Sequence, residues 1–319
     1  MTTTLAKMSF TAILALILGL QVLDDRSLGN SIRTSNVEGV VATTSVRSQL
    51  ERAAQQSGLA IAMFNFKGIG ILDFRQRSFK FRKLPFKGNS IWGAVSRDGT
   101  KIAIAQTVTK PETISVVNSD GTDLREYSGI IEGTLMCWSY DNSQLIAVTP
   151  SDPPPGMALL ELKGGQIERL PVAEMVTSQC WSPDGTKVVY QGKDDKILIY
   201  DLKTHDSTTV VSGTQPTWSP DGNWIACRDG EKYFRIQPNG AGKKVLFTRS
   251  RAVSGLYWSP DSQFVAYVHQ DFFSLDTEFY HLFVRRLRDN AEEWVANGDD
   301  ATGTNYQWIL NKQIAQAQN

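Results

Sequence analysis

The sequence predicts an all-β protein that folds as a six-bladed β-propeller, closed by pairing of strands from the two ends of the chain. Two observations support this. A motif with an aromatic residue before a tight turn recurs about every 40 residues, a period typical of propeller blades. Three apolar segments without a motif precede the first copy, and one follows the last full repeat. The five full copies are centred on Ser96, Ser139, Ser182, Ser219 and Ser259.

The stretch QCWSPDGTKVVY, residues 179–190, shows why each motif predicts a strand, a turn and a second strand. Pro183 presets φ for the second position of a type I turn, and Asp184 tolerates the third and hydrogen-bonds locally. Gly185 accepts the left-handed conformation that follows. The β-branched and aromatic residues up to Tyr190 then favour a strand.

Each period also contains two further apolar segments, for example KILIYDL (196–202) and STTVVSG (207–213). Each repeat therefore supplies four short strands. Propellers of this size do not need one large core, because each blade packs mainly on its neighbours.

The ends of the chain supply the sixth blade. Three strands are predicted before the first motif, at 59–65, 69–75 and 78–84, and one after the fifth blade, at 304–309. Trp308 in YQWILNKQIA keeps the aromatic residue of the motif without the turn sequence. We therefore expect a composite blade in which the C-terminal strand is innermost and pairs with residues 59–65.

The repeated W-S-P-D-G sequence resembles the TolB-like family of propeller repeats over roughly residues 58–310. The resemblance implies a non-catalytic scaffold that binds a protein or another ligand. In this family the propeller binds the lipoprotein Pal at one end of its channel, within the Tol-Pal envelope system. In place of the family's N-terminal α/β domain this sequence has only some tens of residues.

The N-terminal region predicts export, to the periplasm or outside the cell. Residues 1–21 have Lys7 before the apolar stretch MSFTAILALILGL, which is typical of a signal peptide and shorter than a membrane span of roughly 20 residues. No clear A-x-A cleavage site follows, so an uncleaved signal anchor is an open alternative. Residues 22–57 are expected to be a linker and a short helix, and residues 311–319 a C-terminal tail.

The short helix is predicted within TSVRSQLERAAQQ, residues 44–56. Val46, Leu50 and Ala53 share one helical face, and Thr44 or Ser45 is a suitable N-cap. We expect this helix to cap the propeller.

Charge balance gives no reason to expect nucleic acid or an anionic membrane as partner, because 33 basic residues face 33 acidic ones. A protein partner is expected, a small polar ligand is an alternative, and a membrane contact would come only through an N-terminal anchor. The basic stretch 74–88 alternates aromatic and basic residues, which favours a solvated outer strand. No cofactor is expected.

The three cysteines are interpreted mainly as small buried apolar residues. Cys137 and Cys180 occupy the same position in successive blades, directly before the tryptophan, while Cys227 lies in a second strand. Export would permit a disulfide between Cys137 and Cys180, and an odd count leaves at least one free thiol.

The alternative function is a propeller enzyme, a lyase or hydrolase, with a site around residues 269–281. His269 and His281 lie near acidic residues in HQDFFSLDTEFYH, which we interpret as a long polar loop with solvated side chains. The sequence contains no G-x-S-x-G or H-E-x-x-H motif. TolB-like propellers also precede serine-hydrolase domains in the prolyl oligopeptidase group, and this chain ends where such a domain would begin. We therefore expect no catalytic residues and no metal.

Two rings of polar residues follow from the repeat. The motif aspartates are assigned a structural role, because a short polar side chain suits that turn position. Hydroxyl residues recur five positions before the anchors and open each innermost strand, so we expect them to encircle one mouth of the channel and bind a ligand. Alternatively, each hydroxyl forms a hydrogen bond to the backbone of the loop that enters its own strand. The hydroxyl ring comprises Thr134, Thr177, Thr214, Ser254 and Thr304.

Overall fold

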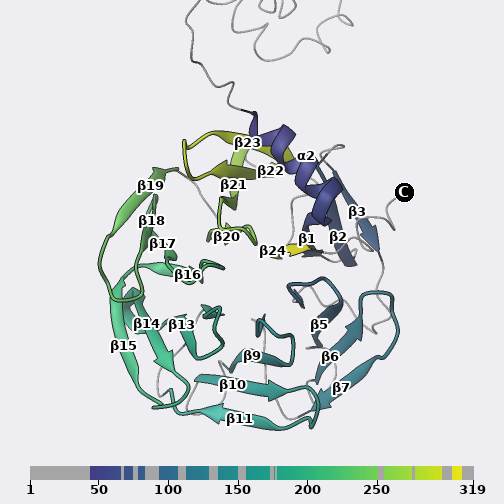
Figure 1. Cartoon of the computed structure of the whole chain (residues 1–319), viewed down its shortest axis with the longest axis vertical. Coiled ribbons are helices and arrows are strands. Elements are labelled where there is room, and N and C mark those ends of the chain that lie inside the picture. Colours follow the sequence, from purple (N-terminus) through teal and green to yellow (C-terminus); the bar gives the residue numbers. More distant parts are fainter. Residues whose placement is uncertain are drawn as a thin grey trace, which may run out of the picture. The chain divides into compact units, whose positions relative to one another are not determined.

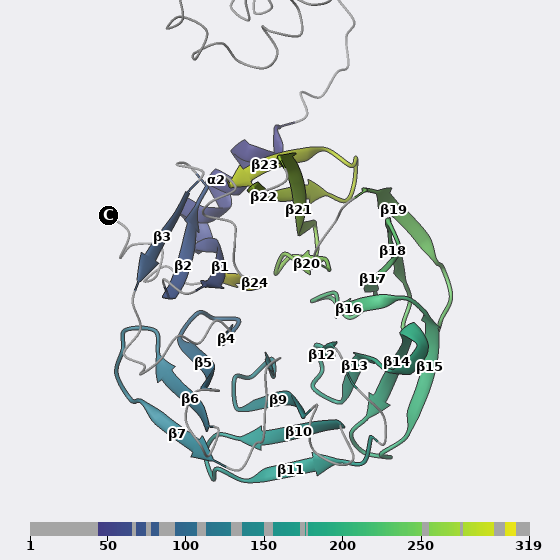
Figure 2. The same ribbon diagram turned by 180° about the vertical axis from the view of Figure 1, so that it is seen from behind.

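The propeller consists of six four-stranded antiparallel sheets arranged around a ring, which confirms the predicted fold class (Figures 1 and 2). The computed structural model describes residues 44–65, 68–74, 78–82, 93–106, 113–128, 136–149, 156–172, 176, 178–250, 255–274, 277–296 and 304–310.

Five blades are continuous in sequence, and in each the strand before the motif turn is innermost. The strands of each blade are given from the innermost outwards. Blade 1 has β4 (Gly93–Val95), β5 (Lys101–Gln106), β6 (Thr113–Asn118) and β7 (Arg125–Ser128), and blade 2 has β8 (Met136–Trp138), β9 (Gln144–Thr149), β10 (Gly156–Glu161) and β11 (Ile167–Leu170). Blade 3 has β12 (Ser178–Trp181), β13 (Lys187–Gln191), β14 (Lys196–Asp201) and β15 (Ser207–Ser212); blade 4 has β16 (Thr214–Trp218), β17 (Ile225–Asp229), β18 (Lys232–Ile236) and β19 (Lys244–Thr248); and blade 5 has β20 (Tyr257–Trp258), β21 (Phe264–Ser274), β22 (Thr277–Arg286) and β23 (Glu292–Ala296). A short 3₁₀ helix, η1 (Lys193–Asp195), precedes β14.

The closing blade joins the two ends of the chain. Its strands are β24 (Thr304–Leu310), β1 (Leu59–Asn65), β2 (Gly68–Asp73) and β3 (Ser78–Arg82), in that order from the axis outwards. Leu59 pairs with Leu310, and Ile61 pairs with Trp308. The predicted pairing of the C-terminal strand with residues 59–65 is therefore confirmed.

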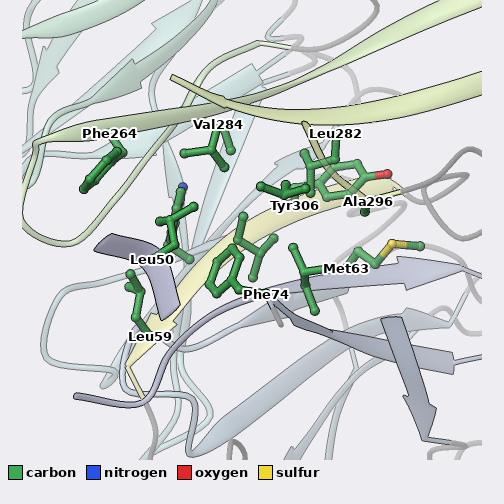
Figure 3. Close-up of a cluster of buried hydrophobic side chains, with 14 of the residues drawn as sticks. Leu50, Leu59, Met63, Phe74, Phe264, Leu282, Val284, Ala296 and Tyr306 are labelled. Atoms are coloured by element: carbon green, nitrogen blue, oxygen red, sulfur yellow. The ribbon is translucent and has the colours of Figure 1, made fainter. Parts of the chain in front are cut away.

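Helix α2 (Val46–Ser57) covers the seam between the closing blade and blade 5, and the predicted helix is confirmed. Ser45 is the N-cap, and its Oγ accepts a hydrogen bond of 3.2 Å from the backbone N–H of Ser48. Leu50 packs into one apolar cluster with Met63 of β1 and Val284 of β22 (Figure 3). The helix thus buries apolar residues from both sides of the ring closure.

A buried arginine fastens the start of α2 to blade 5. The side chain of Arg286 is only 3% exposed and forms an ion pair of 2.7 Å with Asp289. Its Nη1 also donates to the carbonyl oxygen of Thr44, at 2.6 Å, and to Oε1 of Gln49, at 3.0 Å. These partners offset the cost of removing the guanidinium from water. Because two of them belong to the start of α2, they hold the helix in one position against blade 5.

The predicted polar loop at residues 269–281 is wrong. Most of these residues belong to a long hairpin, in which β21 ends at Ser274 and β22 begins at Thr277, and His269 pairs directly with His281. The segment contains aromatic residues, which favour strands over loops.

Residues 1–43 and 311–319 lie outside the described residues, so the signal segment, the linker and the C-terminal tail stay predictions. Within the described part of the chain, no helix has both the length and the apolar character needed to cross a membrane.

Candidate functional site

The motif turns form one end of the propeller axis and share one hydrogen-bond pattern. In each of the five, the serine hydroxyl donates to the aspartate two positions later, at 2.5 to 2.7 Å. The same hydroxyl accepts the backbone N–H five positions later, at 2.8 to 3.0 Å. The aspartates therefore have the predicted structural role. The residues are Asp98, Asp141, Asp184, Asp221 and Asp261.

The tryptophans before these turns are buried and tie neighbouring blades together. The indole Nε1 donates to the carbonyl oxygen of the residue before the aromatic position in the preceding blade. The four bonds are Trp138 to Ala94 at 3.0 Å, Trp181 to Cys137 at 3.2 Å, Trp258 to Thr217 at 3.2 Å and Trp308 to Tyr257 at 2.9 Å. Trp218 instead donates to Gly222 in its own turn, at 3.2 Å.

A cavity of about 240 Å³ lies on the axis, because residues of all six innermost strands or their turns line it. Its wall contains the residues that directly precede the aromatic position, among them Cys137, Cys180 and Gln307. Its rim contains the residues that directly follow the anchor serine in four of the five full motifs. The rim residues are Arg97, Tyr140, Pro220 and Pro260.

Arg97 connects three blades at this rim. Its guanidinium carbon lies 4.4 Å from the ring centre of Tyr140 in blade 2, and its Nη2 donates to the carbonyl oxygen of Pro260 in blade 5, at 3.2 Å. Burial raises the pKa of the Tyr140 phenol. Near neutral pH the rim therefore carries one fixed positive charge beside a neutral hydroxyl.

The cavity wall also contains two neighbouring thiols. Cys137 and Cys180 are half-buried and free. Each thiol donates a weak hydrogen bond to the carbonyl oxygen of the tryptophan that follows it, at 3.7 Å for Cys137 and 3.6 Å for Cys180. Interaction between the two thiols raises the pKa of Cys137 and lowers the pKa of Cys180. Cys227 is instead buried between β-strands, where desolvation raises its pKa to about 12. The expected burial as a small apolar residue fits Cys227 best.

The predicted hydroxyl ring is only partly within the described residues. Thr134, Thr177 and Ser254 lie outside them, and Thr304 begins β24 without a described side chain. Thr214 begins β16, and its Oγ1 donates to the carbonyl oxygen of Arg228, at 3.3 Å. This hydrogen bond agrees with the alternative given above, in which the hydroxyl binds local backbone instead of a ligand. The ligand-binding role of the ring stays a prediction.

The histidines of the alternative enzyme site make ordinary contacts. Nε2 of His269 lies 2.9 Å from the carbonyl oxygen of Ser250, and the ring of His281 packs edge-on against Trp294 at 5.6 Å. Among the described residues, no three His, Cys, Asp or Glu side chains are grouped closely enough to hold a metal ion.

Sequence reasoning missed Arg97 and Tyr140, although a signal for them was present. Both occupy the position after the anchor serine, where the other three full motifs have proline. A residue that differs from the other repeats at this position is not needed to form the turn, and this difference is the signal in the sequence.

Comparisons with known proteins identify the fold. No protein-family model matches the chain. The uncharacterized peptidase YuxL of Bacillus subtilis (strain 168) is 33% identical over 106 residues, which cover 28% of this chain and only 16% of the peptidase.

Solved structures match a larger part of the chain. TolB from Acinetobacter baumannii has a TM-score of 0.61 at 18% identity, covering 79% of this chain and 66% of that one. A putative TolB from Agrobacterium tumefaciens has a TM-score of 0.58 at 17% identity, covering 79% and 92%. A chain of a nidogen/laminin complex has a TM-score of 0.56 at 11% identity, covering 79% and 99%. The chain therefore has a TolB-like propeller fold, as its repeats predict.

Proposed function

We propose that the protein is an exported, non-catalytic scaffold that binds a protein partner at the end of the axial channel formed by the motif turns. The observation that carries this proposal is Arg97, held across the rim of the axial cavity by Tyr140 and Pro260. Residues of several blades converge only on the axis, so a ligand there is recognised from several sides at once.

The cavity is too small for a drug-sized molecule, which needs about 300 to 1,000 Å³. A volume of about 240 Å³ suits one or two side chains at the tip of a partner's loop. A small polar ligand is the alternative occupant.

The charge at the rim indicates which side chain enters. The guanidinium of Arg97 donates to one backbone carbonyl and stacks on Tyr140, and it has five N–H donors in total. A carboxylate is the group that best matches this fork. We therefore infer a partner loop with an aspartate, a glutamate or a terminal carboxylate.

The rest of the rim supports such a contact. Pro220 and Pro260 are held in tight turns, and Tyr140 is fixed by Arg97, so these residues lose little conformational entropy on binding. Aromatic residues and arginine at the centre of a contact contribute most of the affinity in protein interfaces.

Export and the absence of catalysis belong to the same proposal. The apolar segment after Lys7 and the TolB-like repeats support a position in the cell envelope or outside the cell. The match to a peptidase covers too small a share of that enzyme to support hydrolysis. The contacts of His269 and His281 fit a structural hairpin.

The test is site-specific photo-crosslinking in envelope extract. A photoreactive residue replaces Tyr140 at the rim or, as the control, Val245, which is 50% exposed on the outermost strand β19. We expect one discrete adduct from position 140, absent when Arg97→Ala is added, and none from position 245. An adduct from position 245 alone, or one independent of Arg97, would contradict the proposal.

A further inference from the structure

We propose that Cys137 and Cys180 form a two-thiolate site for one Cu(I) ion in the wall of the axial cavity. The inference does not depend on the partner proposed above. It rests on the positions of the two thiols, on the donors near them and on the charge at the cavity rim.

The backbone fixes the two thiols as a pair. Each cysteine directly precedes the tryptophan at the end of an innermost strand, β8 or β12, in adjacent blades. The hydrogen bond of 3.2 Å from Trp181 Nε1 to the carbonyl oxygen of Cys137 joins these two strands at that level. Because the scaffold holds both residues, a ligand that bridges the sulfur atoms needs little rearrangement.

The thiols are within reach of a small ion. Both are half-buried, and both line the cavity of about 240 Å³ from the same position of adjacent innermost strands. The third cysteine, Cys227, lines no part of this cavity and is only 2% exposed. The chain therefore supplies one paired site and one internal control.

The donor set selects the ion. Soft thiolates favour Cu(I), which is satisfied by two of them, whereas a structural Zn²⁺ site needs four ligands. In the described part of the chain, no third His, Cys, Asp or Glu completes such a group. The two sulfurs thus suit a two-coordinate soft ion better than zinc.

The charge of the complex also fits the cavity. Binding replaces two S–H protons by two Cu–S bonds, so Cu⁺ and two thiols give a complex of charge −1 and two released protons, with no change of oxidation state. Arg97 lies on the rim of the same cavity and supplies one positive charge. Trp138 and Trp181, which directly follow the cysteines, are buried and give the site apolar neighbours.

The experiment is an anaerobic titration of the reduced full chain with Cu(I), in competition with the chromogenic chelator bathocuproine disulfonate. We expect one Cu(I) per chain and an ultraviolet sulfur-to-copper charge-transfer band. Cys137→Ser and Cys180→Ser should each weaken binding by about 100-fold or more, because a direct ligand is lost. Cys227→Ser, the matched control, should bind as the wild type does, and excess Zn²⁺ should not displace the copper.

A second variant keeps the test valid if a serine substitution impairs folding. Arg97→Gln leaves both thiols in place and should weaken Cu(I) binding several-fold at low salt, with the charge-transfer band retained. Less than one bound Cu(I) in fully reduced wild type would overturn the proposal. Unchanged affinity in folded Cys137→Ser or Cys180→Ser, or loss of binding in folded Cys227→Ser alone, would overturn it as well.

Discussion

The indole Nε1 of Trp181 donates a hydrogen bond of 3.2 Å to the carbonyl oxygen of Cys137, and this bond joins blade 3 to blade 2 beside the axis. The bond from Trp308 to Tyr257 has the same form and joins the closing blade to blade 5. Four of the five tryptophans at this position, all except Trp218, thus connect neighbouring blades, and the turn that follows each full motif holds the end of the strand in place.

Replacing one such tryptophan should destabilise the whole ring. Trp181 is 1% exposed, so Trp181→Ala should lower the free energy of unfolding by about 3 to 5 kcal/mol, as large-to-small core substitutions do. Urea unfolding measures the change. Trp294, which is 37% exposed on β23, is the control, and Trp294→Ala should cost clearly less. Equal stability of Trp181→Ala and the wild type would show that the indole does not hold the blades together.

Removing the C-terminal strand should open the ring. A chain that stops after residue 303 lacks β24 and leaves the pairing edge of β1 exposed, and open strand edges promote aggregation. We expect oligomers in size-exclusion chromatography and a lower melting temperature. A chain that stops after residue 310 keeps β24 and should behave as the full chain does. If the shorter chain stays monomeric with unchanged melting, the closure does not stabilise the protein.

The repeat predicted the blades, the composite closure and the role of the motif aspartates, because each depends on a local pattern that recurs in register. It did not identify Arg97 and Tyr140, since their proximity arises only when blades 1, 2 and 5 meet at the axis. Cys137 and Cys180 were recognised as equivalent positions, but their place in the wall of one cavity depends on the same convergence. The hairpin at residues 269–281 was mistaken for a loop, because its many polar residues resemble loop composition and its strand pairing depends on the backbone of both strands.

Acid should destabilise the motif turns. Hydrogen bonds from Ser139 and then Ser143 lower the pKa of Asp141 below its ordinary value of 3.8. The folded state therefore binds this proton less tightly than the unfolded state, and the stabilisation is present above that value and lost as the pH falls through the folded pKa. Urea midpoints between about pH 2 and pH 6 measure the loss. Asp141→Asn should reduce the pH dependence, and an identical profile in both proteins would contradict this role.

Cys227 should resist alkylation in the folded protein. Burial raises its pKa to about 12, so its thiolate, which is the reactive form, is scarce near pH 8. Iodoacetamide labelling followed by mass spectrometry should modify Cys227 only after unfolding in urea. Equal labelling rates with and without urea would show that blades 3 and 4 do not enclose this residue.

Binding of the partner at the motif-turn end of the channel is tested most directly by the affinity of the crosslinked partner, once purified, for three variants. Arg97→Ala removes a charge-assisted contact of about 1.5 to 3 kcal/mol and should weaken binding by ten-fold or more. The combined change of Thr134, Thr177 and Thr214 to alanine, which tests the expected hydroxyl ring, and Lys80→Ala on the outer strand β3 should leave the dissociation constant near that of the wild type. The contrary result, a ten-fold loss in the threonine variant with full affinity in Arg97→Ala, would place the partner at the hydroxyl ring instead.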